Sequence, residues 1–219
     1  MERKIITTGD GSKTIQISDW DEQYHSKHGA VQEAYHVFIK HGLSLFFGKN
    51  IHILEIGFGT GLNALITRME SKKNPTEITY RGVEAYPVSP EELEQLNYIS
   101  ELKAEEFRSD FEKMHTAPWE NDVRISENFL LKKEQKFFAD IDDENVFDLV
   151  YFDAFGARVQ PELWTEDIFS KMYRAMKKDG VLVTYAAKGS VRRAMLAVGF
   201  EVERLPGPPG KREMLRAKK

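Results

Sequence analysis

The sequence predicts an α/β protein with a doubly wound, mostly parallel sheet, a short N-terminal β-hairpin and an antiparallel C-terminal hairpin. Two observations support this fold class. Segments with strand character alternate with segments of helical spacing through the middle of the chain, as is typical of parallel βαβ units. Glycine and proline residues also stand where the expected helices begin and end. We expect a single domain over residues 1–219, with a hairpin extension at 1–28 and a core at 29–219.

The first two elements precede the alternating body. Residues 4–18, "KIITTGDGSKTIQIS", alternate in polarity around Gly-Asp-Gly and predict a β-hairpin. In the segment from Gly29 to Phe47, the spacing of Val31, Tyr35, Phe38 and Ile39 predicts an amphipathic helix. Neither element carries residues that we interpret as catalytic.

The body then alternates between strands and helices. The apolar patterns predict strands at 51–56, 78–84, 123–126, 146–152 and 181–186, and helices from Thr60, after Ser89 and over 166–176. Ser89, Pro90 and Glu92 have the spacing of a capping box, whereas Gly180 and Gly199 are placed where helices end. The segments 200–204 and 212–217 flank "LPGPPGK" and predict the closing antiparallel hairpin.

Composition restricts the class of protein. With 41% hydrophobic residues over 219 positions, the chain can bury one sizeable core, and it has no apolar run long enough to span a membrane. The absence of cysteine excludes disulfides, thiolate metal sites and a cysteine nucleophile, and is compatible with a cytoplasmic protein. The net charge is −4, but the segment from Lys188 to the end carries nine Lys and Arg against three Glu. This basic end is either a patch that contacts phosphates or an ordinary solvated surface.

A glycine-rich segment, "ILEIGFGTGLNALI" at residues 53–66, joins a predicted strand to a predicted helix. Such a turn exposes unpaired backbone N–H groups at the positive end of the helix dipole, where a ligand can approach closely. A dinucleotide site would require a third glycine where the chain has Leu62, so the spacing disfavours NAD. Glu55 would also repel a pyrophosphate, but it suits a ligand that carries a positive amine or sulfonium.

The pattern Glu55-x-Gly57-x-Gly59-x-Gly61 resembles the first motif of class I S-adenosylmethionine-dependent methyltransferases, which implies a Rossmann-like fold. The next predicted strand ends in "YRGVEAYP", which puts Glu84 at the usual position of a carboxylate that binds ribose hydroxyls. We therefore expect Glu55, Gly57, Phe58, Gly59, Gly61 and Glu84 to bind S-adenosylmethionine. The alternative is a glycine turn kept for packing and a surface glutamate.

A second candidate segment, "FDLVYFDAFGARVQPELW", runs from a buried strand into Asp153. In an open α/β sheet, ligands bind outside the carboxyl ends of the strands where the strand order reverses, which is where Asp153 is expected. We interpret Asp153 as the catalytic residue. The alternative is that its side chain only caps a turn.

From "YHSKHGAVQEAYHVFI" onward, the chain resembles the methyltransferase domain of the MnmC family, most specifically in "DAFGARVQPELW" and the terminal Lys-Arg-Glu-Met. The resemblance implies methyl transfer to the aminomethyl nitrogen of wobble 5-aminomethyl-(2-thio)uridine in tRNA, with Asp153 at the active site. We expect Phe155 to stack on the flipped uracil, because aromatic faces commonly hold unstacked bases, unless Phe155 is a core residue. The family's FAD oxidase domain is absent, so we expect a separate oxidase to supply the amine.

Three differences from the family pattern concern the substrate and the cofactor. Gly156-Ala157 replaces the usual Ala-Pro, and Gly207-Pro208-Pro209-Gly210 replaces Gly-Phe-Gly. Asn128 stands where the family commonly has an aspartate beside the adenine, and its amide oxygen can still accept a hydrogen bond from the adenine amino group.

The remaining polar residues give expectations about partners. We expect Arg192, Arg193, Lys211 and Arg212 to contact tRNA phosphates, although each is also a plausible surface residue. His25 and His28 lack partners at a metal-binding spacing, so we expect no metal. Two other functions remain compatible with the sequence: a methyltransferase for a small amine and a non-catalytic tRNA-binding domain.

Overall fold

A central sheet of eight strands forms the body of the protein in the computed structural model, which describes residues 2–219. The strand order is β10-β11-β9-β8-β4-β5-β7-β6. The five strands from β9 to β7 are mutually parallel, and β11 and β6 run antiparallel to their neighbours. The predicted fold class is confirmed. The strands are β4 (Asn50–Ile56), β5 (Glu77–Val83), β6 (Asp122–Ser126), β7 (Phe129–Glu134), β8 (Phe147–Phe152), β9 (Met176–Thr184), β10 (Glu201–Pro206) and β11 (Glu213–Lys218).

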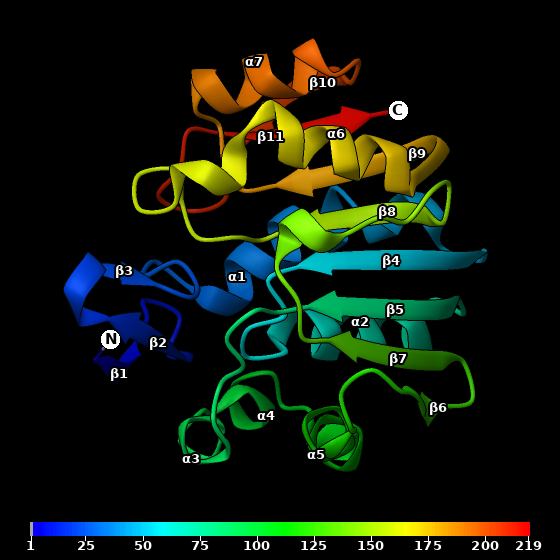
Figure 1. Cartoon of the computed structure of the whole chain (residues 1–219). Coiled ribbons are helices and arrows are strands. Elements are labelled where there is room, and N and C mark those ends of the chain that lie inside the picture. The colour runs from blue at the N-terminus through cyan, green and yellow to red at the C-terminus, as the bar shows by residue number, and fades with distance from the viewer. Residues whose placement is uncertain (1) are drawn as a thin grey trace.

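Helices cover both faces of this sheet (Figure 1). The sheet separates two groups of buried apolar side chains. One packs against α1 and α2, and the other packs against α6 and α7. The central strands are buried on both faces because apolar residues follow one another in them, as in "ILEI" of β4. The helices are α1 (Ala30–Ala34), α2 (Leu62–Lys73), α3 (Pro90–Leu93), α4 (Tyr98–Glu101), α5 (Arg108–Thr116), α6 (Glu166–Ala175) and α7 (Gly189–Ala197).

A small second sheet lies beside the edge at which the parallel strands end (Figure 1). It consists of β1 (Arg3–Thr7), β2 (Lys13–Ile17) and β3 (Glu22–Gln23), and β1 pairs antiparallel with β2 as predicted. The turn between β1 and β2 reaches the start of α1, where Asp10 Oδ2 accepts a hydrogen bond from Gln32 N at 3.0 Å. The N-terminal sheet is therefore fixed to the core by the end of a helix.

Three local predictions differ from the structure. The segment predicted as one helix from Gly29 to Phe47 is divided into α1, a π-helical turn (Tyr35–Lys40) and a 3₁₀ turn (Leu43–Phe46). The capping box at Ser89 forms, but it begins a helix of only four residues. Gly180 lies within β9 rather than at a helix end, because α6 already stops at Ala175. Among residues 2–219, no helix has the length and apolar character needed to cross a membrane.

Candidate active site

A cavity of about 660 Å³ opens at the carboxyl edge of the sheet, between β4 and β8. This is the point where the strand order reverses, because the chain proceeds from β4 to β5 and β7 on one side and from β8 to β9 on the other. The loops after β4 and β8 touch there. Asp153 N donates a hydrogen bond to Ile56 O at 2.9 Å, and a Cβ on Gly57 would lie 2.7 Å from Asp153 O.

The glycine loop is built on three left-handed residues, with φ of 89° at Gly57, 50° at Gly59 and 74° at Gly61. Gly57, Phe58 and Gly59 line the cavity. The Phe58 ring packs on Gly82, where a Cβ would come within 2.3 Å of it. Gly61 faces away from the cavity, since a Cβ there would meet the ring of His115. Gly57 and Gly59 are therefore the glycines that a ligand in this cavity could approach.

Glu84 stands at the end of β5 and lines the same cavity, as predicted. Its Oε2 accepts a hydrogen bond from Gly59 N at 3.1 Å, and its Oε1 accepts one from Tyr86 N at 2.9 Å. Burial raises the pKa of this carboxyl, while the two backbone N–H groups lower it. Each carboxylate oxygen has a further lone pair available, so Glu84 can accept additional hydrogen bonds from hydroxyl groups.

Asp153 is half-buried at the end of β8, and its side chain is held by an amide. Asn63 Nδ2 donates to Asp153 Oδ2 at 2.8 Å and to Glu55 Oε1 at 2.9 Å. Burial and the nearby Glu33 carboxylate raise the pKa of Asp153 to about 7, against the opposing effects of Asn63 and Lys211. Asp153 can therefore accept or release a proton near neutral pH.

Glu55 does not line the cavity, so the expectation of direct contact with a cofactor is wrong for this residue. Its side chain is 1% exposed and accepts a hydrogen bond from Tyr80 OH at 2.8 Å in addition to that from Asn63. Burial raises the pKa of Glu55 well above its ordinary value. Glu55 is linked to the cavity by Asn63, whose Nδ2 donates to both Glu55 and Asp153.

Aromatic rings form one wall beside Asp153. Phe155 lies edge-to-face with Trp20 at 5.7 Å and with Tyr24 at 4.9 Å between ring centroids. All three rings line the cavity, as does His25. The N-terminal sheet thus supplies residues that sequence reasoning assigned no chemistry. In the sequence, the feature that could have indicated this wall is the group of aromatic residues directly after the second predicted strand.

The charged groups of the cavity fit a cationic cofactor. Glu84, Asp153 and Glu162 are the acidic residues of its lining, and Arg3 is the basic residue. Arg3 is itself paired with Glu92 at 3.1 Å. An acidic, partly apolar cavity of this size beside two close-approach glycines suits S-adenosylmethionine, which carries a sulfonium and an amine. Within residues 2–219, no group of three or more His, Asp or Glu side chains could hold a metal ion.

Asn128 lies at the opposite edge of the sheet, so the prediction that it contacts adenine is wrong. The strand at 122–126 runs antiparallel to β7, so its carboxyl end points away from the cavity. Asn128 precedes β7, and its Nδ2 donates to Ser71 O and Thr76 O at 3.2 and 3.0 Å. The end of β7 leads instead to Phe137, Phe138 and Ala139 in the cavity wall.

The four basic residues expected to contact tRNA are placed differently from one another. Arg193 and Arg212 are exposed, and Arg192 is half-buried with an unpartnered Nε. Lys211 is not available to phosphates in this structure, because its Nζ donates to Glu33 Oε1 at 2.5 Å. The phosphate contact expected for Lys211 therefore stays a prediction, and it would require this ion pair to open. The first turn of α7 and the loop from β10 to β11 both lie at the carboxyl edge, on the same side as the cavity.

Comparisons with known proteins find related sequences and structures. Residues 94–219 match a family described as S-adenosyl-L-methionine-dependent methyltransferase. The chain is 29% identical over 210 residues to the "tRNA 5-methylaminomethyl-2-thiouridine biosynthesis bifunctional protein MnmC" of Hydrogenovibrio crunogenus, covering 89% of this chain and 31% of that protein. It is 31% identical to the protein of the same name from Leptospira borgpetersenii, covering 92% and 33%. The chain thus spans about a third of the length of these relatives.

Solved structures share the fold. The crystal structure of MnmC2 from Aquifex aeolicus aligns with a TM-score of 0.79 and 26% identity, covering 99% of this chain and 69% of that one. Spermidine synthase from Thermotoga maritima aligns with a TM-score of 0.55 and 15% identity, covering 99% and 72%. The second likeness concerns the fold alone.

Proposed function

The chain belongs to the S-adenosyl-L-methionine-dependent methyltransferases, and from that premise we propose that it methylates the aminomethyl nitrogen of wobble 5-aminomethyl-(2-thio)uridine in tRNA. The observation that carries this proposal is the half-buried carboxyl of Asp153, which lines an acidic cavity beside the glycine loop and Glu84. A carboxyl in that position suits an amine substrate. The similarity to the MnmC relatives over most of this chain supports tRNA as the molecule that carries this amine.

We propose that Glu84, Gly57, Phe58 and Gly59 hold the cofactor. When bound, S-adenosyl-L-methionine supplies an electrophilic methyl group on its sulfonium sulfur. The free lone pairs of the Glu84 carboxylate would accept hydrogen bonds from the ribose hydroxyls. The two glycines leave the backbone open to close approach by the cofactor. The Phe58 ring, which packs on Gly82, forms part of the cavity wall.

Asp153 has two tasks in the proposed reaction. The substrate nitrogen needs a free lone pair, because a protonated ammonium cannot form the new C–N bond as the C–S bond breaks. A pKa of about 7 makes Asp153 a better proton acceptor than an ordinary aspartate. After Asp153 has released that proton to water, its carboxylate accepts a hydrogen bond from the neutral amine and stabilises the positive charge that develops on nitrogen as the C–N bond forms. Alignment of the reacting groups contributes the larger part of the rate enhancement.

Phe155, Trp20 and Tyr24 form the apolar wall against which the uracil ring would lie. Aromatic faces commonly hold bases that have been turned out of a stack. Arg192, Arg193 and Arg212 stand at the same edge of the sheet and would contact the phosphates that flank this base. We propose that residues 1–219 act as one methyltransferase domain in the cytoplasm, and that a separate oxidase supplies the amine.

The experiment that tests the function is mass spectrometry of wobble nucleosides. Cells that lack the gene should accumulate 5-aminomethyl-(2-thio)uridine, and the purified protein with the methyl donor should convert that nucleoside in their tRNA. Unchanged nucleosides in both assays would overturn the proposal. Binding of the methyl donor without tRNA methylation would point instead to a small amine as substrate.

A substitution at Asp153 tests the catalytic role separately. Asp153→Asn removes the proton acceptor but keeps the shape of the side chain. We expect affinity for the methyl donor, measured by calorimetry, to stay nearly unchanged while turnover falls roughly 10²-fold or more. Turnover equal to that of the wild type would exclude the role proposed for Asp153.

A further inference from the structure

Lys211 and Glu33 form an ion pair next to the cavity, although they are far apart in the sequence. Lys211 lies in the loop from β10 to β11, and its Nζ donates to Oε1 of Glu33 in α1 at 2.5 Å. Glu33 is 6% exposed, and its second oxygen accepts a hydrogen bond from Ser26 N at 2.9 Å. Both carboxylate oxygens of this buried acid are therefore occupied, which suits an ionised group.

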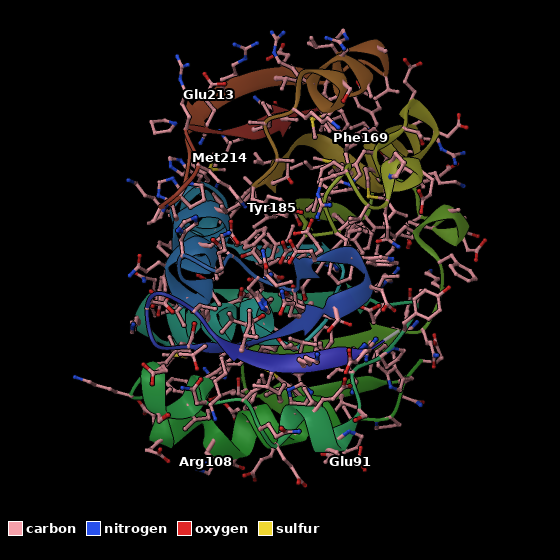
Figure 2. All side chains as sticks on the ribbon, turned by 90° about the vertical axis from the view of Figure 1, so that its left-hand side faces the viewer. Glu91, Arg108, Phe169, Tyr185, Glu213 and Met214 are labelled. Carbon is pink, nitrogen blue, oxygen red and sulfur yellow. The ribbon has the colours of Figure 1, made fainter. Side chains whose placement is uncertain are left out.

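The pair is connected to the loop that carries Asp153. Lys211 Nζ lies 3.7 Å from the centre of the Tyr185 ring, a distance typical of a close cation–π contact. Tyr185 OH donates to Ala154 O at 2.8 Å, which is the carbonyl directly after Asp153. Tyr185 lies near the middle of the face shown in Figure 2, between the N-terminal ribbon and the strands above it.

The two charges of the pair act on Asp153 in opposite directions. The negative charge of Glu33 favours the protonated form of Asp153, whereas the positive charge of Lys211 favours the carboxylate. Burial of the Asp153 side chain acts in the same direction as Glu33, and the hydrogen bond from Asn63 acts in the same direction as Lys211.

The other ionisable groups near Asp153 come from separate elements of the fold. Glu55 of β4 and Tyr80 of β5 both interact with its charge, as does Tyr185 after β9. Glu84 and His25 lie in the same cavity lining. The positive charge of Lys211 lowers the pKa of the Asp153 carboxyl.

We propose that Glu33 and Lys211 are a pair of positioning residues that brace the loop at Asp153 and set the fraction of its side chain present as carboxylate. The proposal rests on the function proposed above for Asp153 in amine methylation. Neither residue is among those that line the cavity. The pair acts through the Tyr185 contact on the backbone and through its charges on the Asp153 carboxyl. This role accounts for the direction of the Lys211 side chain, which points toward Glu33 and Tyr185.

The test is a titration of the Asp153 side chain in three variants. The protein is labelled with ¹³C at the aspartate carboxyl, and the Asp153 signal is identified by its absence from the spectrum of Asp153→Asn. Lys211→Met should raise the midpoint of this titration by roughly one pH unit, and Glu33→Gln should lower it by a similar amount. The double variant should return it close to the wild-type value, because both charges are then removed.

A purely structural role gives a different result. Loss of packing would lower the melting temperature in all three variants without opposite shifts of the midpoint. Equal midpoints in Glu33→Gln and the wild type, or shifts of the same sign in the two single variants, would overturn the proposal. If Lys211→Met does not fold, Glu33→Gln and the double variant decide the question alone.

Lys177→Met is a matched control. Lys177 Nζ also pairs with a carboxylate, Asp148 Oδ2 at 2.8 Å, but Asp148 lies near the start of β8 rather than at its end. This control should leave the midpoint of Asp153 unchanged. Because the titration needs neither tRNA nor the methyl donor, its outcome is independent of the nucleoside assay. Failure of the positioning role and failure of the proposed function can therefore be told apart.

Discussion

The Asp153 side chain combines features that oppose each other energetically. It is half-buried, and both this burial and the nearby Glu33 carboxylate favour the protonated form of Asp153. One amide, that of Asn63, bridges Asp153 and Glu55. Ionisation of Asp153 therefore costs free energy that the native packing has to offset. Ionisable groups that are energetically unfavourable in this way are common at functional sites.

This cost predicts an effect of pH on stability. The native pKa of Asp153 is about 7, above the ordinary value of 3.8, so the native state binds more protons than the unfolded state between these values. The contribution of Asp153 to stability therefore falls as pH rises through this window. At pH 8, Asp153→Asn should be more stable than the wild type, by on the order of 1–3 kcal/mol. Urea unfolding at pH 8 and pH 4.5 measures both values.

The comparison between the two pH values is the control. At pH 4.5 the wild-type Asp153 is protonated in the native state, so the difference between the two proteins should be much smaller than at pH 8. A difference that is constant with pH would show that Asp153 does not titrate in this window.

Glu84 gives a second prediction at the scale of one residue. Its carboxylate is held by two backbone N–H groups and faces the cavity. Glu84→Ala should weaken binding of S-adenosylmethionine by roughly 10- to 100-fold, since it removes hydrogen bonds to a charged acceptor. Calorimetry with the methyl donor measures this loss. Glu94→Ala, at an exposed glutamate that does not line this cavity, should leave the affinity unchanged.

The site residues whose positions in the cavity lining match the sequence prediction share one property: these positions follow from local chain geometry. Gly57, Glu84 and Asp153 each come directly after a parallel strand, Gly59 follows two residues after Gly57, and such strand ends meet at one edge of a sheet. The positions of Glu33 and Lys211 could not be predicted in this way. They are 178 positions apart, and only the tertiary fold brings them together.

At the scale of elements, strand direction decides what the sequence can predict. The apolar pattern at 123–126 correctly indicates a strand, but nothing in that pattern distinguishes a parallel from an antiparallel partner. Because β6 and β7 form an antiparallel hairpin, Asn128, which lies in the turn between them, is at the edge opposite the cavity. The segment at 129–134, which we did not predict as a strand, is the one whose end reaches the cavity.

The turn from β4 to α2 gives a prediction about a single glycine. Gly57 has a φ of 89°, and a Cβ there would lie 2.7 Å from the backbone oxygen of Asp153. Gly57→Ala therefore adds a backbone clash to the strain of a left-handed residue. We expect a loss of about 2–4 kcal/mol in the free energy of unfolding, measured in urea.

Gly48→Ala is the matched control for this substitution. Gly48 has a similar φ of 78°, but no heavy atom lies within 4 Å of the added Cβ. It should lose only the cost of the left-handed conformation, about 1–2 kcal/mol. Equal losses in the two variants would mean that the β4 and β8 loops are not in the contact described above.

At the scale of the whole molecule, the cavity is shared between two sheets. The carboxyl edge of the central sheet supplies the acids and glycines, and the N-terminal sheet supplies Trp20 and Tyr24. Arg158 joins the two parts, because its Nη2 donates to Trp20 O at 3.1 Å and pairs with Glu22 at 3.2 Å. The sequence alone predicted the hairpin but not its place over the site, since that packing depends on contacts between distant segments.

Charge is also distributed over the whole molecule in a way that favours an anionic partner at one edge. The net charge is −4, so bulk attraction to nucleic acid is weak. The exposed Arg193 and Arg212 and the half-buried Arg192 nevertheless lie in segments at the carboxyl edge, and none of them forms an ion pair with another of the residues 2–219. Arginines without a partner on the same chain can bind phosphates at little cost in lost interactions.

Replacement of these three arginines by glutamine should therefore weaken tRNA binding and reduce its dependence on salt. Each phosphate contact contributes roughly one unit to the slope of log K against log salt, so the triple variant should lose up to about 3 units. Filter binding over a series of salt concentrations measures the slope. Lys218→Gln is the control, because Lys218 lies at the end of β11 on the opposite edge and pairs with Asp179. If the triple variant kept the wild-type slope, the phosphates would have to meet a different surface, and the tRNA could not approach the cavity from the edge that carries α7.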